Sequence, residues 1–170
     1  MYVSNKQLSK IKLLVTDVDG VMTDGGMYYT EDGNEFKKFN TRDGTAIQLL
    51  RKRGIKTAII TGEDTTIVNR RAEKLNIDSD LVLQNVDNKM LALKWINRSF
   101  MLDYSEIAYI GDDINDLPVL KKVGFAFCPR DAVEEVQKIC FVSTKNGGNG
   151  VIRDFYELMK KYVFETYKYG

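Results

Sequence analysis

The sequence predicts an α/β fold in which helices cover both faces of a doubly wound parallel sheet. Short apolar runs alternate with segments of helical period along most of the chain, which is the pattern of successive βα units. The apolar runs contain few polar residues, as expected of strands buried on both faces. The chain has 170 residues and no repeat, low-complexity stretch or Pro-rich linker, so we expect one domain over residues 1–170.

The first strand is expected from Ile11 to Thr16, and two short runs then flank the turn signal Glu31-Asp32-Gly33-Asn34. This β-hairpin, at about residues 25–40, interrupts the alternation and is therefore expected to be an insertion. Thr41 can cap the next helix and Gly54 can end it. The remaining pattern predicts helices over 41–53, 65–75, 88–100, 115–123, 132–138 and 151 to about 162, and strands over 56–60, 81–83, 107–110, 125–127 and 141–143.

Composition excludes several classes of function. Lys plus Arg is 25 and Asp plus Glu is 24, giving a net charge of +1, so no charge excess favours nucleic acid or an anionic membrane as a partner. No run approaches the ~20 apolar residues that span a bilayer. The two cysteines, Cys128 and Cys140, have neither metal-site spacing nor a disulfide framework. A cytoplasmic protein with free thiols is expected.

The chain contains no histidine. That absence excludes Ser-His-Asp and Cys-His catalysis and any His-ligated zinc. Any chemistry must therefore draw on carboxylates, Lys, Arg, hydroxyls or backbone amides, with or without a hard metal ion.

Acidic residues follow the first strand in the segment Asp17-Val18-Asp19-Gly20. Residues i and i+2 of a strand point the same way, and two unpaired carboxylates facing one space call for a cation. Polar clusters also follow two later strands, and a lysine opens a later helix. Because parallel strands present their carboxyl ends to one edge, we expect one crevice to contain Asp17, Asp19, Thr61, Gly62, Lys89, Asp112, Asp113 and Asp116.

An all-oxygen ligand set of this kind suits Mg²⁺. The lysine, the threonine hydroxyl and backbone amides beside such a metal form a receptacle for a phosphoryl group. One Asp can attack phosphorus, and a second Asp can protonate the leaving oxygen and later deprotonate water. These residues therefore predict metal-assisted hydrolysis of a phosphate monoester.

The segments Asp17-x-Asp19-Gly20-Val21-x-Thr23, Thr61-Gly62, Lys89 and Gly111-Asp112-Asp113-x-Asn115-Asp116 resemble, in order, the four motifs of the haloacid dehalogenase-like phosphatases. The resemblance implies a Rossmann-like fold, Asp17 as nucleophile and Asp19 as general acid/base. It implies that Thr61, Gly62 and Lys89 hold the phosphoryl group and that Asp17, the Asp19 carbonyl and Asp112 hold Mg²⁺. Asp113 and Asp116 would support the metal site, with simple capping of the short helix as the alternative.

The motifs follow one another too closely for a cap domain, so an open site is expected. Capless members of this family often use a neighbouring subunit as a lid, which implies a homo-oligomer, most often a tetramer. Tyr28, Tyr29, Phe36 and Phe39 make the hairpin a candidate contact.

Three further segments resemble the capless phosphatases of 2-keto-3-deoxy sugar acids: Gly25-Gly26-x-x-Tyr29, residues 39–44, and Gly147-Gly148-x-Gly150-x-x-Arg153. Glu63 stands where the octulosonate 8-phosphate enzymes commonly have Arg. This residue, with Arg71 and Lys74, favours a nonulosonate 9-phosphate as substrate, with octulosonate 8-phosphate as the alternative.

Several assignments have an alternative of comparable weight. Glu63, Arg71 and Lys74 could contact substrate or lie on a solvated surface, and Arg42 could bind substrate or pair with Asp43. Arg153 could close over the site with the glycine segment or lie on a helix surface. Two other functions are weaker: a signalling receiver domain, which places its acidic pair differently, and a non-catalytic oligomerisation module, against which the intact motifs argue.

Overall fold

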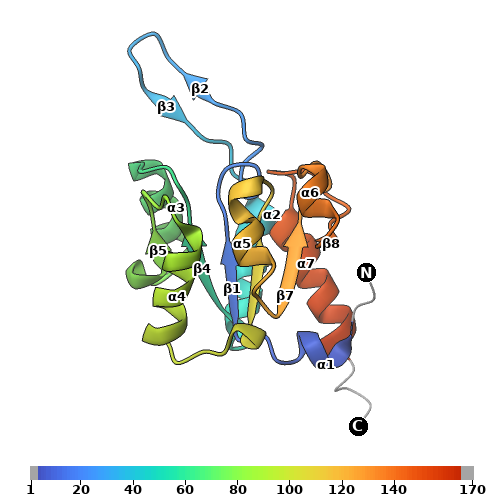
Figure 1. Cartoon of the computed structure of the whole chain (residues 1–170). Helices are drawn as coiled ribbons and strands as arrows, with labels where there is room; N and C mark the ends of the chain where they lie inside the picture. The colour runs from blue at the N-terminus through green and yellow to red at the C-terminus, as the bar shows by residue number, and fades with distance from the viewer. Residues whose placement is uncertain (1–3, 166–170) are drawn as a thin grey trace.

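The computed structural model describes residues 4–165 and contains a six-stranded parallel sheet in the order β5-β4-β1-β6-β7-β8 (Figure 1). The central strands are wholly or largely buried, which agrees with their apolar composition. The predicted doubly wound sheet is therefore confirmed. The strand bounds are β1 Leu13–Thr16, β4 Lys56–Ile60, β5 Val82–Leu83, β6 Ile107–Ile110, β7 Phe125–Cys128 and β8 Phe141–Val142.

The register of the three central strands aligns the positions that matter for the site. Thr16 in β1 lies beside Ile59 in β4 and beside Ile110 in β6. The residues that follow these strands therefore emerge at one level of one sheet edge. This is the edge at which open α/β sheets bind ligands.

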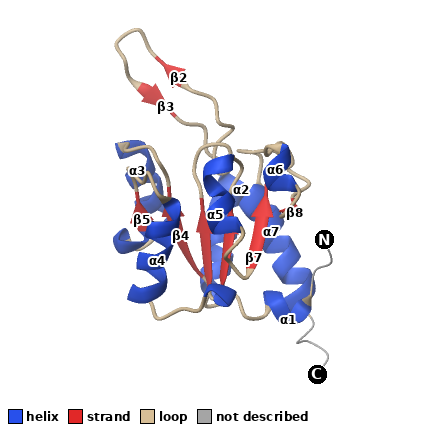
Figure 2. Ribbon diagram, in the orientation of Figure 1, coloured by secondary structure: helices blue, strands red, loops and turns tan. Residues whose placement is uncertain are grey.

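Helices cover both faces of the sheet. Figure 2 shows α5 in front of the sheet and α2 behind it; α4 packs beside α5, while α7 and α3 pack against α2. The helical bounds are α1 Asn5–Leu8, α2 Thr41–Lys52, α3 Thr66–Leu75, α4 Lys89–Ser99, α5 Leu117–Leu120, α6 Glu134–Gln137 and α7 Val151–Met159. No helix in residues 4–165 is long and apolar enough to cross a membrane.

The predicted hairpin is present and projects beyond the sheet edge (Figure 1). It consists of β2 Tyr28–Tyr29 and β3 Glu35–Phe36, which pair antiparallel. Each strand has only two residues, fewer than the apolar runs predict. A two-stranded ribbon with no third strand or helix against it gains little from longer pairing.

The short elements differ most from the sequence prediction. The helix expected over 115–123 is a 3-10 turn at Ile114–Asp116 followed by the four residues of α5. The last helix leaves α geometry after Met159 and continues as a π-helical turn, Lys160–Phe164. Helix α1 was not predicted, because four residues are too few to show a helical period.

Candidate active site

The carboxyl ends of β1, β4 and β6 enclose a pocket of about 300 Å³. In the part of the chain that the structure describes, no cap domain covers it. The structure brings most of the predicted set to its lining: Asp17, Asp19, Thr61, Gly62, Glu63, Lys89, Asp112 and Asp113.

A buried charge network forms the floor of the pocket. The Lys89 ammonium lies 2.5 Å from Asp17 Oδ2 and 2.8 Å from Asp116 Oδ1. Lys89 begins α4 at a turn fixed by Asn88, whose side chain accepts hydrogen bonds from two backbone amides of that helix. All three charged side chains are almost fully buried, so their geometry is set by the packing of three separate elements.

Asp116 lies behind the pocket and is fully buried. Its carboxylate accepts from Lys89, from the Tyr109 hydroxyl at 2.6 Å and from the Asp112 amide at 3.0 Å. Its oxygens are therefore committed to protein donors. Asp116 orients Lys89 and the Asp112 loop, which supports its predicted role behind the metal site. The hydrogen bond from Tyr109 was not predicted from the sequence, because the position of Tyr109 in a strand does not show that its hydroxyl reaches Asp116.

The pocket holds more negative charge than one lysine can offset. Burial and the charge of Asp116 raise the pKa of Asp17 to about 7, although Lys89 acts against them. Burial, with the charges of Asp17 and Asp116, likewise raises the pKa of Asp112 to about 7. Carboxylate oxygens of Asp17, Asp112 and Asp116 lie within 4.8 Å of one another. Such crowding of hard oxygen ligands fits a divalent cation.

The loop after β1 is shaped to this cluster. Gly20 has a φ of +78°, and a Cβ at this position would lie 2.0 Å from Asp112 Oδ2. Only glycine allows the backbone to pass so close to that carboxylate. Magnesium is the cofactor that this set accommodates, and Asp17, Asp112 and the Asp19 carbonyl are the groups that would hold it.

The Asp19 carboxylate and several hydrogen-bond donors lie around the cluster of Asp17, Asp112 and Asp116. Asp19 is held by the Thr23 hydroxyl at 3.2 Å and by the Lys37 ammonium at 2.8 Å. The Thr61 side chain is buried at the end of β4, and Glu63 lies exposed at the rim. Lys37 comes from the hairpin and was not anticipated from the sequence.

Three predicted substrate contacts do not line the pocket of their own chain. Arg42 and Lys74 are exposed on α2 and α3. The Arg71 guanidinium donates to the Asn40 carbonyl at 2.9 Å and lies over the Phe39 ring. Substrate contact by these three residues stays a prediction.

Asp43 is buried, and it does not form an ion pair with Arg42 among the described residues. Its Oδ1 accepts from the Arg153 amide at 2.8 Å, so it caps the first turn of α7. Burial raises the pKa of the Asp43 carboxyl to about 6.

The glycine segment, residues 147–150, packs against the loop that follows β1 rather than folding over the pocket. The Gly148 amide donates to the Val21 carbonyl at 3.0 Å, and a Cβ at Gly147 would lie 2.1 Å from the Gly20 carbonyl oxygen. Arg153 pairs with Glu157 on α7 at 2.6 Å. In this chain Arg153 is therefore a helix-surface residue, and the segment buttresses the loop that carries Asp19.

Comparisons with known proteins agree with this geometry. The haloacid dehalogenase-like hydrolase family matches residues 34–124. The 3-deoxy-D-manno-octulosonate 8-phosphate phosphatase of Escherichia coli K12 is 35% identical over 150 residues, covering 88% of this chain and 79% of that protein.

Two solved structures are also similar. The octulosonate 8-phosphate phosphatase of Moraxella catarrhalis, in complex with magnesium, phosphate and KDO, has a TM-score of 0.90 at 35% identity and covers 96% of this chain and 95% of that one. The cobalt-bound phosphatase of Haemophilus influenzae has a TM-score of 0.88 at 32% identity and covers 96% and 95%.

Proposed function

The chain belongs to the haloacid dehalogenase-like hydrolases and is a phosphoric monoester hydrolase, and we propose that its substrate is 3-deoxy-D-manno-octulosonate 8-phosphate. The observation that carries this proposal is the similarity to octulosonate phosphatases along nearly the whole chain, combined with an intact Asp17, Asp19, Lys89 and Asp112 in one pocket. An intact catalytic set in a hydrolase chain leaves no support for the receiver-domain or non-catalytic hypotheses.

The nine-carbon substrate that Glu63 favours is not supported. The relatives are octulosonate 8-phosphate enzymes, so the eight-carbon alternative is the better supported one. Glu63 is exposed at the pocket rim, and it is tied to the end of β4 through its backbone, whose amide donates to the Thr61 hydroxyl at 3.3 Å. For the choice of substrate, Glu63 alone is weaker evidence than sequence similarity to octulosonate 8-phosphate phosphatases along nearly the whole chain.

In the proposed mechanism, an Asp17 carboxylate oxygen attacks phosphorus and the bond from phosphorus to the sugar oxygen breaks. Asp19 gives its proton to the departing sugar oxygen and then takes a proton from the water that attacks the aspartyl-phosphate. That second attack releases inorganic phosphate and restores the Asp17 carboxylate. Lys89 and the Thr61 hydroxyl hold the phosphoryl oxygens. Bound Mg²⁺ would supply neutralisation of charge on the phosphoryl group.

A comparison of two substrates tests the choice of sugar acid. We expect kcat/KM for octulosonate 8-phosphate to exceed that for a nonulosonate 9-phosphate by about tenfold or more, since one recognised group is worth ~1.4 kcal/mol or more of selectivity. Glu63→Arg should leave this order unchanged. A preference of the native enzyme for the nine-carbon substrate would contradict the proposal.

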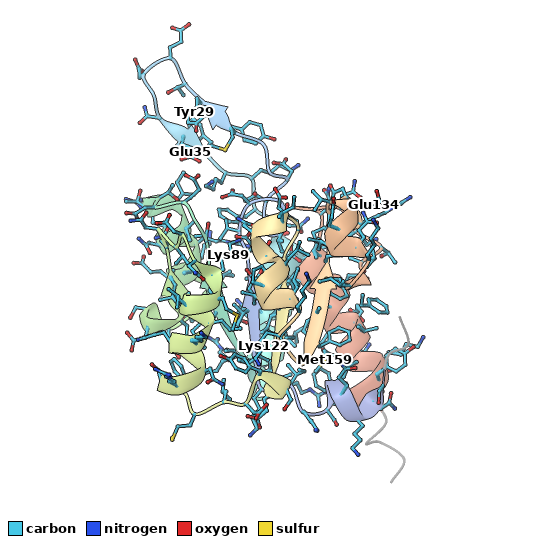
Figure 3. The ribbon with its side chains drawn as sticks, viewed as in Figure 1. Tyr29, Glu35, Lys89, Lys122, Glu134 and Met159 are labelled. Atoms are coloured by element: carbon cyan, nitrogen blue, oxygen red, sulfur yellow. The ribbon has the colours of Figure 1, made fainter. Side chains whose placement is uncertain are left out.

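We further propose a homotetramer in which a neighbouring subunit covers the pocket. Its support is the exposure of aromatic side chains on the hairpin, where Tyr29 is 61% and Phe36 is 58% exposed. Figure 3 labels Tyr29 on the projecting hairpin. Sedimentation at micromolar concentration should give a tetramer, and Tyr29→Asp should dissociate it. A fully active native monomer would contradict the shared lid.

A further inference from the structure

The hairpin contacts Asp19, one of the residues that line the pocket, through the side chain of Lys37. The Lys37 ammonium lies 2.8 Å from Asp19 Oδ1 and 3.0 Å from Glu35 Oε1. Its side chain is 1% exposed, whereas that of its neighbour Lys38 is 61% exposed and pairs with Asp24. Two adjacent lysines in a projecting ribbon therefore have opposite environments. Figure 3 labels Glu35 on the projecting hairpin and Lys89 near the upper end of α4.

Lys37 lies between two carboxylates for a geometric reason. Glu35 begins β3 and Lys37 directly follows that strand, two residues on, so their side chains lie on the same face. That face is turned toward the loop that carries Asp19. Burying an ammonium is costly unless charged partners surround it, and Glu35 and Asp19 are those partners. The hairpin and the loop that carries Asp19 are thereby joined by an ion pair whose lysine side chain is buried.

The two carboxylate oxygens of Asp19 differ in their hydrogen-bond partners. Oδ1 accepts from Lys37 and also from the Thr23 hydroxyl at 3.2 Å. No hydrogen-bond donor in residues 4–165 reaches Oδ2. A protonated carboxyl carries its hydrogen on the oxygen that is not already accepting from a cation. This arrangement therefore reserves Oδ2 for the proton that Asp19 delivers and later collects.

We propose that Lys37 is a positioning residue for proton transfer: it holds Asp19 by Oδ1 so that Oδ2 faces the departing oxygen and, later, the attacking water. This role rests on the general acid/base function of Asp19 given above. It makes the hairpin part of the catalytic apparatus, in addition to any contact it makes with a second subunit. Glu35 is the anchor that keeps Lys37 in place.

Leaving-group dependence of kcat/KM tests the proposal. An alkyl phosphate such as glycerol 2-phosphate needs a proton donor for its leaving oxygen, whereas p-nitrophenyl phosphate does not. Lys37→Met should lower kcat/KM for the alkyl ester by about 10- to 100-fold, at or below the contribution of a positioned proton donor. It should lower kcat/KM for the aryl ester by less than about threefold. Glu35→Gln should show the same pattern with smaller losses, and Lys38→Met should match the native enzyme on both substrates.

The decisive control is the background in which Asp19 is absent. If Lys37 acts through Asp19, then adding Lys37→Met to Asp19→Asn should cause no further loss on the alkyl ester. Equal losses on both esters, or an undiminished effect in the Asp19→Asn background, would overturn the positioning role. If Asp19→Asn itself showed no leaving-group dependence, the general-acid assignment of Asp19 would fail instead, and the two failures are thereby distinguished.

Discussion

Asp17→Asn is expected to lower phosphate release by about 10⁴-fold or more, since removal of a covalent nucleophile costs losses of that order. The amide cannot attack phosphorus, and the surrounding network offers no second group in its place. Lys89 and Asp116 would stay, but Asp116 is held by three donors behind the pocket. Steady-state phosphate release at saturating substrate and Mg²⁺ gives the measurement.

The same variant should fold normally. Burial and the Asp116 charge already disfavour ionised Asp17, as its raised pKa of about 7 indicates. A neutral amide of equal size therefore removes the repulsion from Asp116 as well as the attraction to Lys89. We expect its free energy of unfolding in urea to lie within about 1 kcal/mol of the native value. Asp80→Asn, at an exposed turn before β5, is the matched control and should retain full activity. Normal turnover of Asp17→Asn would refute the nucleophile assignment.

Magnesium is expected to stabilise the protein strongly above pH 7 and hardly at all near pH 5. Without a cation, burial raises the pKa of both Asp17 and Asp112 to about 7, above the ordinary value of ~3.9 in an unfolded chain. Between about pH 4 and 7 the unfolded chain therefore releases these protons first, and the metal-free protein loses stability as pH rises. A cation binds the ionised carboxylates, so it restores that stability where they are charged.

Thermal melts with and without Mg²⁺ measure this linkage. At a Mg²⁺ concentration about 100 times Kd, binding adds ~2.7 kcal/mol, which corresponds to a rise in Tm of about 5–10 °C at pH 8 for a chain of this size. The rise should fall below about 2 °C at pH 5 and should vanish in Asp112→Asn at both pH values. Chelation should abolish turnover. An equal rise in Tm at both pH values would show that the cation does not bind these carboxylates.

The catalytic centre was predictable because its residues follow directly from strand ends. A parallel sheet brings Asp17, Thr61 and Asp112 to one edge whatever their separation in sequence, and the register of β1, β4 and β6 then sets them at one level. The absence of histidine further excluded His-dependent catalysis and His-ligated zinc. Local pattern and simple topology therefore suffice for this part of the molecule.

The contacts around that centre were less predictable, since they depend on tertiary packing between distant segments. Lys37 lies in an ordinary charged hairpin, and only the folded approach of Asp19 distinguishes it from Lys38. In the sequence Tyr109 is one residue of an apolar strand, and only the folded structure shows that its hydroxyl donates to Asp116. Arg71 was assigned by resemblance alone, and its actual neighbours, Phe39 and Asn40, come from another element.

The nucleophilic role of Asp17 is tested most directly by identifying the carboxylate that becomes phosphorylated. Asp19→Asn should form the intermediate from p-nitrophenyl phosphate but hydrolyse it slowly, because no general base remains for water. Borohydride reduction of the quenched protein converts an aspartyl-phosphate to homoserine, which peptide mass spectrometry locates. We predict homoserine at position 17. Homoserine at position 112 or at another aspartate position, with position 17 unmodified, would contradict Asp17 as the nucleophile.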